Sequence, residues 1–432
     1  MATLTKRSKR LKGEPVDEAL KLRESAQKSG DQPLSPDAEW NQLPYEILLQ
    51  VFHYLDDNSD KYHAALTCKS WLRPLSAPSI WRTGDFRFTL TSVRKALEFV
   101  MNTGKTLRHI RADCPESKDS VLSSSTHELY LFLAHLLNAG NKQLLTLRLT
   151  NISRLKASPV HQMSDVVKLL ALLLQQQQQL RSLHLSNALL TLAQGQELLS
   201  AASQSSCNTL QTLAVDEFVS PSFILNASTY LANSIAILCG FRQLSELEVS
   251  YSYLVDDVLL GLAQSANTNL QLMTVCADDD VEQERQTTPE AWQSLGSACP
   301  DLKVKVVIQS KMGSYFDRSL LFILTQSMPL YALHWNTGPA IAIANIKLGL
   351  NHVATHFQNS LHYLKIESGV RIDDDSTMEM FESLHQCKQL ETLTLSLVCN
   401  RRTDEEMYKR SIRAALARSP MSCSVQFNGQ DI

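Results

Sequence analysis

The sequence lacks any apolar run of the roughly 18 residues that a membrane-spanning helix needs. Its first residues are polar and basic, without the apolar stretch of a signal peptide, so we expect no secretory signal. The nine cysteines are scattered and contain no Cys-x-x-Cys pair. This favours reduced thiols in the cytoplasm or the nucleus over a disulfide framework. Zinc-ligand spacing is also missing among cysteines and histidines, so we predict no metal and no cofactor.

Strong charge of either sign is absent as well. The chain has 41 Lys and Arg against 44 Asp and Glu, a net charge of −3, which implies no strong electrostatic attraction to nucleic acid or a membrane surface. It has no Gly-x-Ser-x-Gly nucleophile motif. Between His352 and His356 the first position is Val353, not the glutamate of a zinc protease. We therefore predict a non-catalytic protein.

Residues 1–38 are rich in charged and small polar residues and poor in aromatic and branched apolar ones. This composition predicts a disordered basic tail. Two interpretations of its basic run stay open: a nuclear import signal or a solvated tail. The run contains Lys6, Arg7, Lys9, Arg10 and Lys12.

Residues 39–86 carry more apolar side chains than so short a segment can bury by itself, since domains below roughly 40–60 residues are marginal. Pro44 suits the first position of a helix. The helix that follows has a wide apolar face, and a second helix is expected before Trp71. One apolar stripe then needs a partner, either the rest of the chain or another protein.

This segment resembles an F-box. The matching residues are Leu43-Pro44, Glu46, Phe52, Leu55, Cys68, Trp71 and Trp81, in the order and spacing of that motif. Two departures are a loop over 56–61 about one residue longer than usual and Thr67 where an apolar residue commonly precedes the cysteine. The alternative is an ordinary helical hairpin that belongs to the neighbouring domain.

The resemblance implies docking on a Skp-type adaptor, which joins the cullin and RING subunits of an SCF ubiquitin ligase. An F-box protein contributes no catalytic group and acts through proximity and orientation. Aromatic Trp81, Phe52 and Trp71 are the expected anchors, because they bury most area. The positions that the resemblance assigns to adaptor contact or to the core of the module are Leu43, Pro44, Ile47, Leu48, Val51, Phe52, Leu55, Leu66, Cys68, Trp71 and Trp81.

A second pattern, Leu-x-x-Leu-x-Leu or a close variant, recurs after the F-box segment. Its spacing of about 31 residues exceeds the usual leucine-rich repeat, and helical segments lie between the copies. We therefore predict an α/β fold class: a short all-α F-box (39–86), then an irregular leucine-rich-repeat solenoid of about ten repeats (87–432) with a parallel strand lining and outer helices. The copies start at Leu107, Leu144, Leu180, Leu210, Leu244, Leu270, Leu302, Leu330, Leu361 and Leu390.

In each copy the residues between the leucines point to the opposite, concave face, where solenoids usually bind ligands. Acidic clusters also follow several strands, and these would meet along one rim. One hypothesis is that the rim receives a basic segment of a substrate; the alternative is capping of the helices that follow. Substrate-binding candidates are Arg148, His184, Asp216, Glu246, Glu248, His334 and Lys365 on the strands, with Asp279, Asp280, Asp374 and Asp375 on the rim.

Two functions remain. The first is the substrate-recognition subunit of an SCF ubiquitin ligase, with an unknown protein substrate. The second is a leucine-rich-repeat scaffold whose F-box-like hairpin only caps the solenoid. Exposure separates them: a ligase subunit presents Leu43, Val51, Phe52 and Trp81 outward, whereas a cap buries them against the repeat near Leu107.

Overall fold

The computed structural model forms two compact units, Met1–Leu180 and Arg181–Ile432. The predicted basic tail (1–38) and the rim residues Asp279, Asp280, Asp374 and Asp375 lie outside the described residues. Within the described ranges, every helix is too short or too polar to span a bilayer. The structure describes residues 39–55, 57–89, 91–115, 125–220, 236–265, 269–278, 287–309, 319–337, 343–368, 383–397, 405–406, 409–410, 412–414, 424–428 and 430–431.

The first unit begins with a group of short helices. The sequence predicts Pro44 at the first position of a helix. In the structure it is the residue just before α2, which begins at Tyr45. Asp57 caps the second helix, because its carboxylate accepts a hydrogen bond from the Ser59 amide at 2.8 Å. The elements are η1 (Glu39–Gln42), α2 (Tyr45–Tyr54), α3 (Asn58–Ala65), α4 (Lys69–Leu72), η2 (Arg73–Ser76) and η3 (Pro78–Ile80).

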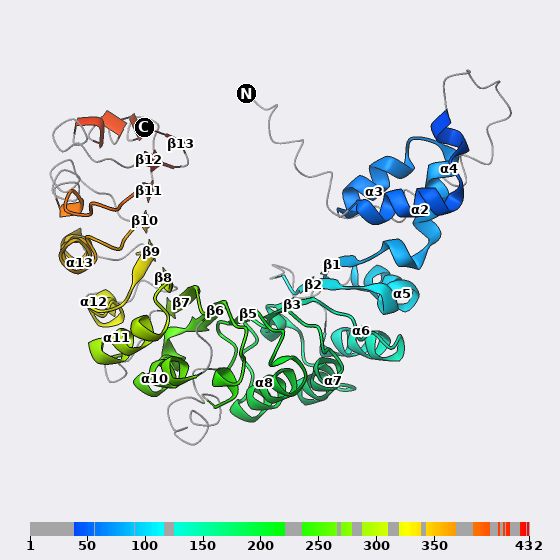
Figure 1. Cartoon of the computed structure of the whole chain (residues 1–432), viewed down its shortest axis with the longest axis horizontal. Helices are drawn as coiled ribbons and strands as arrows, with labels where there is room; N and C mark the ends of the chain where they lie inside the picture. The colour runs from blue at the N-terminus through cyan, green and yellow to red at the C-terminus, as the bar shows by residue number, and fades with distance from the viewer. Residues whose placement is uncertain are drawn as a thin grey trace. The chain divides into compact units, whose positions relative to one another are not determined.

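Strands and helices then alternate, and the helices lie on one side of the strands (Figure 1). Strand β1 pairs in parallel with β2, and β2 with β3. Because β1 begins at Thr83, the sheet starts inside the range predicted for the F-box. The elements are β1 (Thr83–Arg87), α5 (Val93–Thr103), β2 (His109–Asp113), α6 (Thr126–Asn138), β3 (Thr146–Thr150) and α7 (Met163–Gln175).

The second unit continues the alternation. Neighbouring strands from β4 to β12 pair in parallel, and β13 closes the series antiparallel to β12. Its strands are β4 (Ser182–His184), β5 (Thr212–Val215), β6 (Glu246–Ser250), β7 (Leu272–Asp278), β8 (Lys303–Gln309), β9 (Leu330–Asn336), β10 (Tyr363–Ser368), β11 (Thr392–Leu397), β12 (Ser424–Phe427) and β13 (Gln430–Asp431). Its helices are α8 (Leu192–Ser206), α10 (Asp256–Gln264), α11 (Pro289–Ala298), α12 (Ser319–Ile323) and α13 (Ile343–His356).

All ten copies of the leucine motif coincide with strands of these two units, which confirms the predicted α/β class. Their apolar positions face the helices and are buried, as Leu144, Leu147 and Leu149 show. A strand of this kind cannot cover its own leucines, so each repeat depends on its neighbours for burial.

Buried amides tie the repeats of the first unit together. Gln177, in the glutamine run that ends α7, is fully buried. Its side chain donates to the carbonyl of Asn141 at 2.8 Å and accepts from the amide of Leu144 at 3.0 Å. Asn141 in turn donates to the carbonyl of Leu107 at 2.9 Å. These bonds satisfy backbone groups at the loops that lead into β2 and β3, where no sheet partner is available.

Candidate interaction surfaces

Helix α2 carries two apolar stripes with different environments. Leu48 and Phe52 lie four residues apart and point inward, with 2% and 0% of their surface exposed. Ile47 and Tyr54 lie on another side, 41% and 86% exposed, with half-buried Val51 between them in the sequence. One apolar side of α2 is already buried in the core of the helical group. The second apolar side is therefore available to bind another protein.

The inner stripe belongs to a compact core. Phe52 and Trp81 pack in one cluster with Ala65 and Ile80, and half-buried Trp71 lies against it with its ring centroid 6.0 Å from that of Phe52. Trp81 is only 6% exposed. The outward presentation expected of Phe52 and Trp81 as anchors is therefore wrong for this structure. Because aromatic rings bury a large apolar area, these two side chains allow so short a helical group to form a hydrophobic core.

The same cluster reaches into the first repeat. Phe99 of α5 packs edge-on against Trp81, with ring centroids 5.6 Å apart. The hydroxyl of Thr106 donates to the carbonyl of Pro78 at 2.7 Å, and the carbonyl of Arg82 accepts from the amide of His109 at 2.9 Å. The helical group thus shares its core with the first repeat.

The remaining predicted adaptor positions differ in exposure. Leu66, at the end of α3, is 56% exposed. Pro44 is exposed, while Leu43, Leu55 and Cys68 are half-buried. Their contact with an adaptor stays a prediction.

Two exposed aromatic residues escaped the sequence analysis. Tyr54 lies seven residues after Ile47 in α2, a helical spacing that could have revealed it. Trp40 is 66% exposed, and its carbonyl accepts a hydrogen bond from the Trp71 indole at 3.1 Å.

The predicted substrate-binding residues on strands occupy positions that alternate with buried ones. Glu246 and Glu248 of β6 flank buried Leu247. His184 of β4, His334 of β9 and Lys365 of β10 are half-buried, and Arg148 of β3 in the first unit is exposed. These residues lie on the face of the sheet that the sequence pattern predicts for them. Their role in binding a substrate remains a prediction.

Lys303 and Lys305 of β8 were not singled out from the sequence, and both are exposed on either side of buried Val304. The strict alternation of their motif copy is the signal that could have found them.

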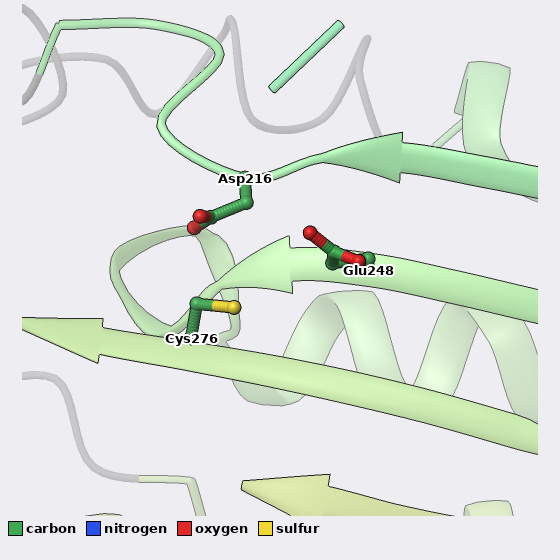
Figure 2. Close-up of side chains that lie close together, drawn as sticks. All are labelled: Asp216, Glu248 and Cys276. Carbon is green, nitrogen blue, oxygen red and sulfur yellow. The ribbon is translucent and has the colours of Figure 1, made fainter. Parts of the chain in front are cut away.

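Two carboxylates and one thiol from three neighbouring repeats converge on the sheet of the second unit. Asp216 follows β5, Glu248 is in β6 and Cys276 is in β7 (Figure 2). Their ligand atoms lie within 4.8 Å of one another, and Asp216 also accepts from the hydroxyl of Ser250 at 2.9 Å. Spacing along the chain could not reveal this group, because its members come from three different repeats.

A second charged group joins β9 and β10. The Lys365 ammonium lies 2.6 Å from one oxygen of Glu367, and the other oxygen lies 3.4 Å from Nε2 of His334. The hydrogen bond from Lys365 lowers the pKa of Glu367. Burial and then the charge of Lys365 lower the pKa of His334.

One of the acidic clusters supports helix capping. Asp256 and Asp257 lie in the first turn of α10, where carboxylates favour the positive end of the helix dipole. Asp256 also accepts from the amide of Thr288 at 2.7 Å, next to the start of α11. This cluster is thus engaged in fixing helix ends.

Comparison with known proteins gives one family match and similarity to one solved structure. Residues 40–87 match the F-box-like family model. Among solved structures, the chain is similar to the leucine-rich repeat-containing protein LegL7 from Legionella pneumophila, with 15% sequence identity over 59% of this chain and 85% of that chain and a TM-score of 0.34. The repeat architecture is shown by the alternation of parallel strands and helices. The chain thus combines an F-box-like region with leucine-rich-repeat-type units.

Proposed function

We propose that this protein is the substrate-recognition subunit of an SCF-type ubiquitin ligase, working in the cytoplasm or the nucleus. The observation that carries the proposal is the outer stripe of α2, defined as Ile47, Val51 and Tyr54. It lies within the residues that match the F-box-like model, and it stays accessible although the core beneath it is complete.

In this role the protein supplies geometry and no catalytic group. The outer stripe and Leu66 bind the Skp-type adaptor, and through it the cullin and the RING subunit. The repeats hold the substrate. Since the helical group and the first repeat share one core around Trp81 and Phe99, the adaptor-binding surface is fixed to that repeat without a flexible joint. Holding the adaptor and the substrate on one chain raises the effective concentration of substrate lysines at the ubiquitin-loaded enzyme.

Co-purification of the full chain with the Skp-type adaptor and cullin tests the proposal. Ile47→Asp and Leu66→Asp together place charge on the surface without touching the buried cluster, so we expect loss of both subunits with an unchanged melting temperature. Met101→Asp is the matched control, because Met101 is 62% exposed on α5 and lies outside the F-box-like region. The folded wild-type chain failing to bind the adaptor would refute the proposal.

The runner-up is a scaffold in which the F-box-like group serves only as a cap. The contact of Trp81 with Phe99 and the hydrogen bonds to Pro78 and Arg82 favour a capping role. Capping and adaptor binding use different residues, however, because the cap engages Trp81 while Ile47 and Leu66 remain exposed. The same co-purification separates them, since a pure cap captures no adaptor.

A further inference from the structure

The exposed face of the second unit is polarised in charge over three neighbouring strands. Glu246 of β6, Leu272 of β7 and Lys303 of β8 are register partners and form one row across the sheet. The next row repeats this order with other residues: Glu248, Thr274 and Lys305. Both rows therefore run from acidic through neutral to basic in the same direction.

The charged side chains at the two ends form no ion pair with each other in the described part of the chain. Neighbouring strands lie about 4.8 Å apart, so the backbones of β6 and β8 are separated by about 10 Å. Among the ion pairs between described residues, none includes Lys303 or Lys305. The ammonium of Lys303 instead lies over the ring of Tyr331, 4.4 Å from its centroid, which holds this charge in place.

Other side chains flank both ends. Asp216 lies beside Glu248 at the acidic end, with ligand atoms within 4.8 Å. At the basic end the Tyr331 ring contacts that of Tyr363, which is 38% exposed, with centroids 5.1 Å apart. In the middle, half-buried Leu272 adds apolar surface.

We propose that this face of β6 to β8 binds an extended segment of the substrate in which a basic, an apolar and an acidic residue occupy alternate positions, i, i+2 and i+4, and so lie on one side of the segment. Four residues at about 3.3 Å each span about 13 Å, and the long charged side chains take up the difference from the roughly 10 Å between the backbones of β6 and β8. Charge complementarity selects this occupant: its basic group pairs with Glu246 and Glu248, its apolar residue covers Leu272, and its acidic group pairs with Lys303 and Lys305. The inference rests on the proposed function only in naming the segment as part of a substrate.

Two synthetic peptides of equal composition test it on the full chain by fluorescence anisotropy at about 50 mM salt. One has the sequence Lys-Lys-Ser-Leu-Glu-Glu, with Lys, Leu and Glu on one side, and its isomer Lys-Glu-Ser-Leu-Lys-Glu carries charge of only one sign on each side. We expect the first to bind about fivefold more tightly, and the preference to shrink at high salt, because screening weakens exposed charge pairs. Equal binding of the two peptides would overturn the proposal.

Variants tie the preference to this face. The double variant Lys303→Glu with Lys305→Glu should abolish the preference between the two peptides. The milder double variant Lys303→Gln with Lys305→Gln should weaken that preference. Circular dichroism checks that both variants are folded. Lys388→Glu is the matched control, because Lys388 is exposed in a turn of the same unit, away from β6 to β8. A preference that survives in both lysine double variants contradicts the assignment to this face.

Adaptor capture measured on the same variants keeps the two proposals separate. The lysine variants should capture the Skp-type adaptor as well as wild type does. A lysine variant that loses the peptide preference but still captures the adaptor shows that the change affects only the face of β6 to β8. If wild type captures no adaptor but still binds Lys-Lys-Ser-Leu-Glu-Glu more tightly than its isomer, the proposed binding face stands and only the ligase role fails.

Discussion

The indole ring of Trp81 lies edge-on against the phenyl ring of Phe99, with centroids 5.6 Å apart. Trp81 ends the F-box-like helical group, whereas Phe99 is in the first helix of the repeats. The contact extends from Trp81 to Tyr62 on one side and from Phe99 to Phe86 on the other, at 5.4 and 5.9 Å. One aromatic core therefore spans the two parts, which allows a surface on the first part to be positioned by the second.

Replacing Phe99 by Ala should weaken this junction. The change leaves a cavity beside Trp81 and Phe86, so we expect a loss of about 3 kcal/mol in the free energy of unfolding. Urea unfolding followed by tryptophan fluorescence measures it. Met101→Ala on the same helix is the control and should cost less than about 0.5 kcal/mol, since its side chain is exposed. Equal costs for the two variants would show that the junction carries no shared core.

The two stripes of α2 predict opposite consequences of mutation. Phe52→Ala should lower the free energy of unfolding by about 3–5 kcal/mol, because Phe52 is fully buried. Ile47→Ala should cost less than about 1 kcal/mol, because its side chain is already partly in water. Denaturant titration of both variants gives the comparison. A larger cost at Ile47 than at Phe52 would invert the assignment of inner and outer stripes.

Within the glutamine run, only one member should matter strongly for stability. Gln177→Ala leaves the amide of Leu144 and the carbonyl of Asn141 buried without this partner, at about 1–3 kcal/mol for each group. Thermal unfolding should therefore start at a clearly lower temperature. Gln179→Ala, at an exposed position two residues later, should leave the melting temperature unchanged. A similar melting temperature for both variants would remove the role of the buried amide.

Two cysteines of the first unit should react at different rates. Burial raises the pKa of the Cys114 thiol to about 12, and the charge of Asp113 adds to this. Burial also acts to raise the pKa of Cys68, but hydrogen bonds from Ser70 and from the backbone at Trp71 outweigh it and lower the pKa.

A lower pKa means a larger thiolate fraction at any given pH, and the thiolate is the form that reacts. Alkylation of Cys68 by iodoacetamide between pH 6 and 9 should therefore exceed that of Cys114 throughout and should rise at a lower pH. Mass spectrometry of timed samples measures both sites, and unfolding in urea should make the two rates alike. Faster reaction at Cys114 in the folded chain would contradict the environments described for these thiols.

The sequence by itself determined the features that rest on local pattern. Leucines at fixed spacing specify a strand with one buried side, so all ten motif copies became strands, and their alternation placed Glu246, Glu248 and Lys365 on the exposed side. The order and spacing around Leu43 and Trp81 sufficed to identify the F-box-like region.

Only the tertiary structure decided which apolar stripe of that region is buried. Phe52 and Ile47 are both apolar residues of one helix, and their spacing cannot tell which faces the core, because that depends on where Trp81 and Phe99 meet. The charged rows across β6 to β8 were likewise out of reach. They depend on the register between strands whose starting residues, Glu246 and Lys303, are far apart in the chain, and that register is set by the packing of whole repeats.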